Sequence, residues 1–234
     1  TFTAPKIERF ELRHSEDRVG FMENDRVYRL VAADGVGGSS HGGHLAQKLC
    51  ESVLLNTGGA KDAIRDELED FSREMSGLKN GRSVSDNEEF WAQKANERGS
   101  ACVLAVADVD IESGSVSGWQ VGDTVVFVEV SDKRKEVAWT TFPDIDADSF
   151  GSRPVQLNCN EPKGSSALKR FDFQNATGRV IICTDGMAEY LLRNGIEEVA
   201  FGILEAEDPA QTLDILRRDG VADDDLSMIM ICPK

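Results

Sequence analysis

The sequence predicts an α+β fold in which pairs of helices cover antiparallel sheets. Segments with strand character come first, and they are followed by a block of helices, further strands, further helices and one last strand. A parallel, doubly wound sheet would instead show a regular alternation of strands and helices. Most of the strand-like segments are also apolar at nearly every position, as expected for central strands that are covered on both faces.

Six apolar, β-rich runs predict the strands, and they cover residues 27–33, 101–109, 118–121, 125–130, 180–183 and 226–232. Apolar residues spaced three and four apart, together with helix start signals, predict helices over residues 44–55, 60–75, 85–96, 187–193 and 209–218. No internal repeat divides the chain, so residues 1–234 are expected to form a single domain. Residues 143–166 are polar and lack periodicity, which predicts a long loop or flap within an insertion around 140–170.

The formal net charge is −16, and 40% of the residues are hydrophobic. The apolar share is large enough for a real core, which argues against disorder. Binding to nucleic acid requires basic side chains that contact phosphates, so the charge argues against a nucleic-acid partner. An acidic excess often serves only solubility, but it also fits a cluster of carboxylates that binds metal ions.

The five cysteines are widely spaced and form no Cys-x-x-Cys pair. Cys102, Cys183 and Cys232 lie within apolar runs, where a cysteine is usually a small buried hydrophobic residue. Their number and spacing predict a reducing, cytoplasmic environment rather than a zinc site. The first residues show no apolar signal region, and no run of about 18 apolar residues occurs, so no membrane association is expected.

Acidic residues recur where the predicted strands end. They are Asp34 after the run 30–33, Asp123 between two strands, Asp185 after the run 180–184, and Asp224 just before the last strand. A single Asp-Gly pair usually marks a turn, but a carboxylate at the end of a buried strand is costly to desolvate without a cation. Several such ends on neighbouring strands would repel one another, and Mg²⁺ or Mn²⁺, which prefer oxygen ligands, would relieve that repulsion.

Six short motifs occur in a fixed order along almost the whole chain. They are Arg13-His-Ser-Glu16-Asp17, Ala-Asp34-Gly35-Val-Gly-Gly, Arg98-Gly-Ser-Ala, Gln-Val-Gly122-Asp123-Thr, Cys-Thr-Asp185-Gly186-Met-Ala-Glu189 and Asp224-Asp-Leu-Ser-Met-Ile-Met. Each motif is weak alone, but the ordered set resembles that of the type 2C metal-dependent serine/threonine protein phosphatases. The residue after Asp34-Gly35 is Val36, as in the bacterial-type branch, whereas eukaryotic members have a histidine there.

The resemblance implies a four-layer α-β-β-α sandwich of two antiparallel sheets flanked by helix pairs, with a binuclear metal centre at one end. It implies hydrolysis of phosphoserine and phosphothreonine in proteins by a water that two Mn²⁺ or Mg²⁺ ions activate; many members hold a third ion. Two adjacent ions lower the pKa of a shared water and stabilise both the attacking and the leaving oxygen, so no protein nucleophile is required. The implied partners are a phosphoprotein substrate and a serine/threonine kinase or its targets.

The resemblance also assigns residues to the metal centre. Asp34 would bridge both ions, and the carbonyl of Gly35 would join the same centre. Asp185 and Asp224 would complete the shell of one ion. The remaining acidic residues of the first motif, Glu16 and Asp17, would serve the other ion directly or through water.

The third ion would lie between Asp123, Asp185 and Glu189. Arg13 would bind the substrate phosphate through its planar pair of donors, although it stands three rather than four residues before the glutamate of its motif. Arg18 and Arg98 are the alternatives for this role. The asparagine that usually follows the last metal-binding aspartate is replaced here by Asp225.

Other functions fit the sequence less well. The glycine-rich segment 35–43 lacks the Gly-Lys-Ser/Thr ending of a nucleotide-binding P-loop. A cysteine-based phosphatase needs an arginine six residues after its nucleophile, and none follows the first four cysteines at that distance. The main alternative is a catalytically silent binding module with the same fold. Loss of the metal ligands from the sequence would identify such a module. His14, His41 and His44 are expected to be loop or surface residues, or else one of them takes part in proton transfer.

Overall fold

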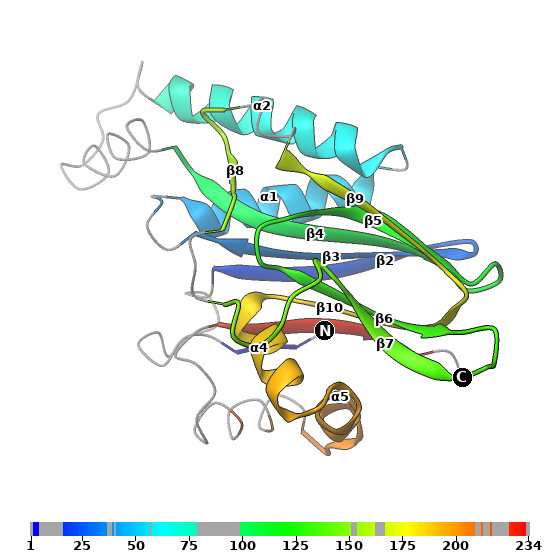
Figure 1. Cartoon of the computed structure of the whole chain (residues 1–234). Coiled ribbons are helices and arrows are strands. Elements are labelled where there is room, and N and C mark those ends of the chain that lie inside the picture. The colour runs from blue at the N-terminus through cyan, green and yellow to red at the C-terminus, as the bar shows by residue number, and fades with distance from the viewer. Residues whose placement is uncertain are drawn as a thin grey trace.

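Two antiparallel sheets lie one on the other in the computed structural model of the chain, and helices cover their outer faces (Figure 1). The structure describes residues 2–4, 16–36, 39, 41–56, 58–78, 99–150, 154–161, 167–208, 212, 216 and 225–232.

Sheet A has five strands in the order β1 (Phe2–Ala4), β11 (Leu226–Ile231), β10 (Ala176–Cys183), β6 (Val125–Ser131) and β7 (Val137–Phe142). Sheet B has six strands. Its order is β2 (Asp17–Asn24), β3 (Val27–Gly35), β4 (Ala101–Asp110), β5 (Ser115–Val121) and β9 (Lys169–Gln174), and the short β8 (Leu157–Asn158) also pairs with β4. Every pairing in both sheets is antiparallel.

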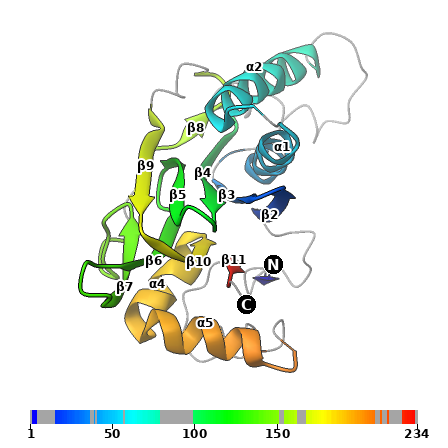
Figure 2. The same cartoon turned by 90° about the vertical axis from the view of Figure 1, so that its right-hand side faces the viewer.

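Helices α1 (Gly42–Leu55) and α2 (Ala60–Leu78) cover the outer face of sheet B, and α4 (Asp185–Asn194) and α5 (Ile196–Glu205) cover the outer face of sheet A (Figures 1 and 2). Three apolar layers hold these elements together: one lies between α1, α2 and sheet B, one between the two sheets, and one between sheet A and α4, α5. The predicted four-layer α-β-β-α sandwich is therefore confirmed.

Strand β3 shows why the central strands are apolar at every position. Leu30 and Ala32 contribute to the layer between the sheets, whereas Val31 and Ala33 contribute to the layer beneath α1, and all four are fully buried. Successive side chains of a strand point to opposite faces, so a strand covered on both faces has no position left for a polar residue. Strand β10 alternates in the same way between the inter-sheet layer and the layer beneath α4 and α5.

All six predicted strands are confirmed as β3, β4, β5, β6, β10 and β11, and three predicted helices are confirmed as α1, α2 and α4, with ends that differ by a few residues. The predicted helix 85–96 lies outside the described residues. So does 209–218, apart from Thr212 and Leu216; the Thr212 amide donates to the Asp208 carbonyl at 3.0 Å, as in a helical turn. Within 143–166, the described part contains only β8 as regular structure.

The sequence patterns missed the short strands β1 and β8, and also β2, β7, β9 and α5. Strands β2 and β9 lie at the edges of sheet B, and β7 lies at an edge of sheet A, so they mix polar and apolar residues. Helix α5 follows Gly195, whose φ of +93° ends α4. Gly202 interrupts the apolar pattern of α5, so that pattern does not predict the helix.

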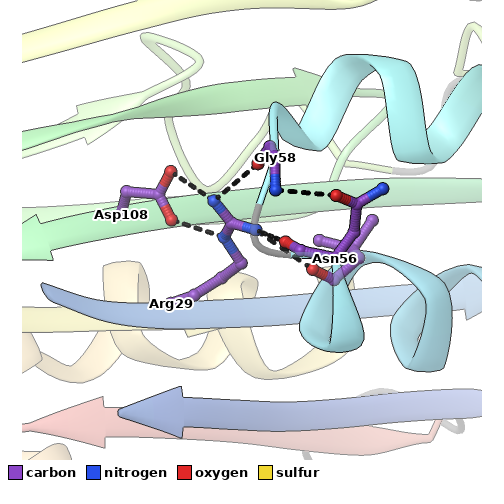
Figure 3. A network of polar contacts seen from close by, with 5 residues as sticks. Arg29, Asn56, Gly58 and Asp108 are labelled. Carbon is purple, nitrogen blue, oxygen red and sulfur yellow. Dashed lines mark hydrogen bonds and ion pairs between the residues drawn. The ribbon is translucent and has the colours of Figure 1, made fainter. Parts of the chain in front are cut away.

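Arg29 of β3 fastens the connection between α1 and α2 to sheet B (Figure 3). Its Nε donates to Oδ1 of Asp108 at 2.6 Å, and its Nη2 donates to Oδ2 of the same carboxylate at 3.1 Å. Nη1 donates to the carbonyls of Val53 (3.2 Å) and Asn56 (2.6 Å), which lie at the C-terminal end of α1. A cation is favourable at this end because the helix dipole is negative there. Arg29 therefore fixes where α1 ends on the sheet.

Replacing Arg29 by methionine should destabilise the protein strongly, because the carboxylate of Asp108 and the last carbonyls of α1 would lose these donors. The Arg29 side chain is only 13% exposed, and breaking such a pair should lower the free energy of unfolding in urea by about 2–4 kcal/mol. Arg26→Met is the control, because Arg26 pairs with Glu112 in solvent, where ion pairs contribute little. Similar losses in both variants would contradict this account of the Arg29 contacts.

Candidate metal centre

Polar side chains gather at one end of the layer between the sheets. Eight polar or charged side chains are buried among the described residues. Six of them lie at this end, beside the last residues of the central strands: Asp17, Gln120, Thr124, Thr184, Asp225 and Ser227. Because buried polar groups are normally distributed sparsely and individually hydrogen-bonded, this concentration marks a site.

The strand alternation places these residues between the sheets. Asp34 has the same parity in β3 as Leu30 and Ala32, which face the inter-sheet layer. Asp17 lies directly opposite Asp34 in the register of β2 and β3. On the other sheet, Thr184 continues the inward-facing positions of β10. The apolar layer thus ends in polar residues on both sheets.

Hydrogen bonds join the sheets across this end, among them one from Thr184 and one to Asp225. The hydroxyl of Thr184, which precedes α4, donates to Oδ2 of Asp17 at 2.7 Å. The backbone amide of Glu16 donates to Oδ2 of Asp225 at 2.8 Å. In both cases a residue at the start of β2 in sheet B meets a residue next to β10 or β11 in sheet A, so the acidic strand ends of the two sheets are held against each other.

Asp17 is a buried carboxyl group among other carboxyl groups, with an exposed fraction of only 2%. The pKa of Asp17 is raised to about 7, mainly by burial; hydrogen bonds with Asp34, Thr184 and Ser227 lower it, whereas the charge of Asp225 also raises it. Desolvation disfavours a charged carboxylate, and a neighbouring like charge adds to that cost. The carboxyl groups of this site are therefore electrostatically crowded, as the sequence predicts.

Gly35, which follows Asp34, lies against the start of α1. A Cβ on Gly35 would lie 2.3 Å from the carbonyl carbon of Gly42 and 2.3 Å from the amide nitrogen of Gly43, so no side chain fits there. The Gly35 amide donates to the carbonyl of Glu16 at 3.2 Å. The glycine-rich segment therefore allows α1 to begin directly beside the acidic strand ends.

Asp123 and Asp185 leave neighbouring strands at this same edge. Strands β6 and β10 pair with Val125 opposite Cys183. Two residues beyond that pair, the antiparallel chains reach Asp123 on one side and Asp185 on the other. Asp123 lies in the connection between β5 and β6, and Asp185 is the first residue of α4.

Glu189 lies one helical turn after Asp185 and takes part in an ion pair. Its Oε1 accepts a hydrogen bond from Nε of Arg193 at 2.9 Å. Nη2 of Arg193 also donates to the carbonyl of Ala147 at 3.1 Å and to Oδ1 of Asp148 at 3.3 Å. Arg193 is half exposed, and pairs of this kind are weak. The pair therefore links α4 to the loop after β7 without excluding Glu189 from a cation site.

The predicted ligand set is described only in part, because Arg13 and Asp224 lie outside the described residues. Within the described part of the chain, no group of three or more His, Cys, Asp or Glu side chains is already arranged to hold a metal ion. The donors that do gather at this end are all oxygens, from Glu16, Asp17, Asp34 and Asp185. Oxygen-only donors fit Mg²⁺ or Mn²⁺, and such a cation would offset the cost of burying these carboxylates.

The sequence patterns missed the neutral residues that orient the acidic ones, namely Thr184, Ser227 and Gln120. Their signal was present but indirect: each occupies an inward-facing position at the end of an otherwise apolar strand. His41 and His44 lie on the side of α1 that faces α2. The ring centroid of His44 lies 5.4 Å from that of Phe71. Burial lowers the pKa of His41, as does the nearby His44, whereas the charge of Glu74 in α2 opposes the fall. A role for either in proton transfer stays a prediction.

The sandwich and its acidic end define the class of protein. The chain belongs to the protein phosphatase 2C family, whose sequence profile matches residues 13–220. A search of curated protein sequences gave no match.

Solved structures of this class share the fold. The serine/threonine phosphatase Stp1 from Staphylococcus aureus superposes with a TM-score of 0.62 at 17% identity, covering 100% of this chain and 93% of Stp1. The serine-threonine phosphatase 2C from Toxoplasma gondii gives a TM-score of 0.56 at 14% identity, with 97% and 93% coverage. RsbX, crystallised with magnesium, gives 0.53 at 14% identity, with 97% and 90% coverage.

The helices in the described part of the chain include none with the length and apolar character needed to cross a membrane.

Replacing Asp17 by asparagine should stabilise the protein in EDTA, because the amide keeps an acceptor for Thr184 and removes a buried charge. The folded pKa of Asp17, about 7, exceeds its ordinary value of 3.8. The wild type should therefore lose stability as the pH rises through that window, since the unfolded state releases the proton first. We expect the melting temperature of Asp17→Asn to exceed that of the wild type, by a margin that grows from pH 5 to pH 8.

Asp172→Asn, an exposed position on β9, is the matched control and should show no such trend. A lower melting temperature for Asp17→Asn than for the wild type at pH 8 would mean that Asp17 is a structural carboxylate rather than a crowded one.

Proposed function

We propose that the chain is a metal-dependent protein serine/threonine phosphatase that uses two Mn²⁺ or Mg²⁺ ions, with a third at a weaker site. Its family supports phosphatase chemistry, and the observation that carries the metal dependence is the buried acidic end of the inter-sheet layer. There Asp17 faces Asp34 across β2 and β3, Thr184 binds the carboxylate of Asp17, and Asp225 binds the backbone amide of Glu16.

Oxygen donors would hold the ions. Asp34 would bridge both ions, and the carbonyl of Gly35 would join the same centre. Asp185 and Asp224 would complete one shell, and Glu16 and Asp17 would contribute to the other, directly or through water. The bound ions supply an activated water and positive charge for the phosphate oxygens.

The chain's own hydrogen bonds orient these carboxylates before any cation binds. The Thr184 hydroxyl fixes one oxygen of Asp17, and the carboxylate of Asp225 fixes the backbone at Glu16. Asp225 stands where the family usually has asparagine, and it performs a backbone-holding role through an oxygen that an asparagine also has. Pre-oriented ligands reduce the reorganisation that metal binding requires.

The third ion would be shared by Asp123, Asp185 and Glu189. Asp123 and Asp185 lie at the ends of adjacent strands. Glu189 would have to give up its contact with Arg193 to bind the cation. An ion pair in solvent is weak, so breaking it costs little free energy. That cost should nevertheless make the third site the weakest.

The substrate would be a phosphoprotein, the product of a serine/threonine kinase or the kinase itself, and Arg13 would orient its phosphate. Arg18 is less suited to that role, because its Nη1 already donates to the carbonyl of Asp17 at 2.6 Å.

We also propose that the chain acts in the cytoplasm, as its cysteine pattern predicts, and as a single domain.

Hydrolysis of p-nitrophenyl phosphate and of a phosphothreonine peptide should require added Mn²⁺ or Mg²⁺ and should stop when EDTA is in excess. Asp34→Asn should remain folded but lose turnover by a factor of at least about 100, because the bridging ligand loses its charge. The exposed substitution Asp172→Asn is the control and should keep full activity. Turnover that persists in EDTA would rule out the metal mechanism, and a wild type that binds phosphopeptide without hydrolysing it would identify the silent binding module.

A further inference from the structure

The chain crosses from one sheet to the other at Asp123. Strand β5 of sheet B ends at Val121, and β6 of sheet A begins at Val125, so only three residues make the crossing. Gly122 has a φ of +88°, and a Cβ on it would lie 2.2 Å from Cγ1 of Val103. The connection is therefore short and closely packed, and its path determines where the Asp123 carboxylate points.

The side chain of Gln120 holds both sides of this crossing. Its amide nitrogen donates to the carbonyl of Gly122 at 2.6 Å and to the carbonyl of Thr124 at 3.1 Å, which are the residues before and after Asp123. Gln120 is only 1% exposed, and Thr124 is fully buried. Water therefore cannot easily replace the amide, and the two carbonyls would lose their donor if it were removed.

A glutamine is an unusual choice for this position unless the amide is needed. Its position in β5 faces the inter-sheet layer, where the preceding inward positions of the same strand hold Gly118 and the apolar Val116. An apolar residue of similar size would fill the same space and avoid the cost of burying an amide. Both hydrogens of the Gln120 amide are donated to carbonyls of the connection that carries Asp123.

We propose that Gln120 is the positioning residue for Asp123: by binding the carbonyls on both sides, it directs the Asp123 carboxylate to the edge where Asp185 leaves β10. This inference rests on the proposed function, in which these two carboxylates share the third and weakest cation. Gln120 touches neither substrate nor metal in this role, and its effect should pass entirely through Asp123.

The test compares Mn²⁺ binding by isothermal titration in the wild type, Gln120→Met, Asp123→Ala and the double variant, with melting temperatures measured in EDTA. Outer-shell substitutions typically weaken metal affinity about 10–100-fold, so Gln120→Met should weaken the weakest Mn²⁺ site by that factor and leave the tighter sites within about twofold. The double variant should bind as Asp123→Ala does, because nothing remains for Gln120 to position. Gln174→Met, at an exposed glutamine of β9, should bind as the wild type does.

Three results would overturn the proposal: unchanged binding in Gln120→Met, losses that add in the double variant, or weakening of the tight sites along with the weak one. Unchanged binding in Asp123→Ala would overturn it too, because the shared site would then not exist. If Gln120→Met melts too low to titrate, Gln120→Asn replaces it, since its amide is one methylene too short to reach both carbonyls. Mn²⁺-dependent turnover of the wild type is measured separately, so failure of this inference is distinguishable from failure of the proposed function.

Discussion

The architecture depends on burying carboxyl groups where two sheets meet. The Thr184 hydroxyl bound to Asp17 and the Glu16 amide bound to Asp225 are among the contacts that join sheet A to sheet B at this end. Between their ends the sheets pack through the apolar side chains of the inter-sheet layer, which associate without directional preference. At this end the geometry is directional, because each hydrogen bond fixes a named strand end against another. The desolvation of Asp17 and Asp225 opposes folding, and a bound cation would recover part of that free energy.

Helix α1 connects this end to the rest of sheet B. Its first residues lie against Gly35 and Glu16, where a side chain on Gly35 would have no space. Its last residues are held by Arg29, whose guanidinium also pairs with Asp108 (Figure 3). Both ends of a single rigid helix are thus fixed to β3 or its neighbours. The position of the Asp34-Gly35 backbone is consequently determined by packing and hydrogen bonds of the whole layer, and not by the acidic residues alone.

The sequence predicts the centre of the fold much better than its margins. The continuous apolar runs of β3, β4 and β10 identify strands covered on both faces, and Asp34 near the end of β3 and Asp185 at the start of α4 identify the functional end. Strands β2, β7 and β9 lie at sheet edges, where one side of the strand is unpaired and solvent accepts polar residues, so their patterns are mixed. Strand β2 is nonetheless essential to the site, since it places Asp17 opposite Asp34.

Roles that depend on contacts between distant residues could not be read from the sequence. Asp225 looked like an added charge beside a metal ligand, whereas its carboxylate accepts the amide of Glu16, 209 residues away in the chain. Gln120 looked like part of a motif, whereas its amide holds the crossing that carries Asp123. Glu189 matched a ligand position, but the sequence does not show that Arg193, its partner within α4, also binds Ala147 and Asp148 in the loop after β7.

The central claim is that the acidic strand ends of both sheets form one cation site. The most direct measurement is an anomalous difference map from crystals grown with Mn²⁺. The account predicts peaks at this end of the inter-sheet layer, with carboxylate oxygens of Asp34 and Asp185 at roughly 2.0–2.3 Å from the ions. Manganese bound only elsewhere on the surface, or an Asp34 or Asp185 side chain turned away from the ions, would contradict it.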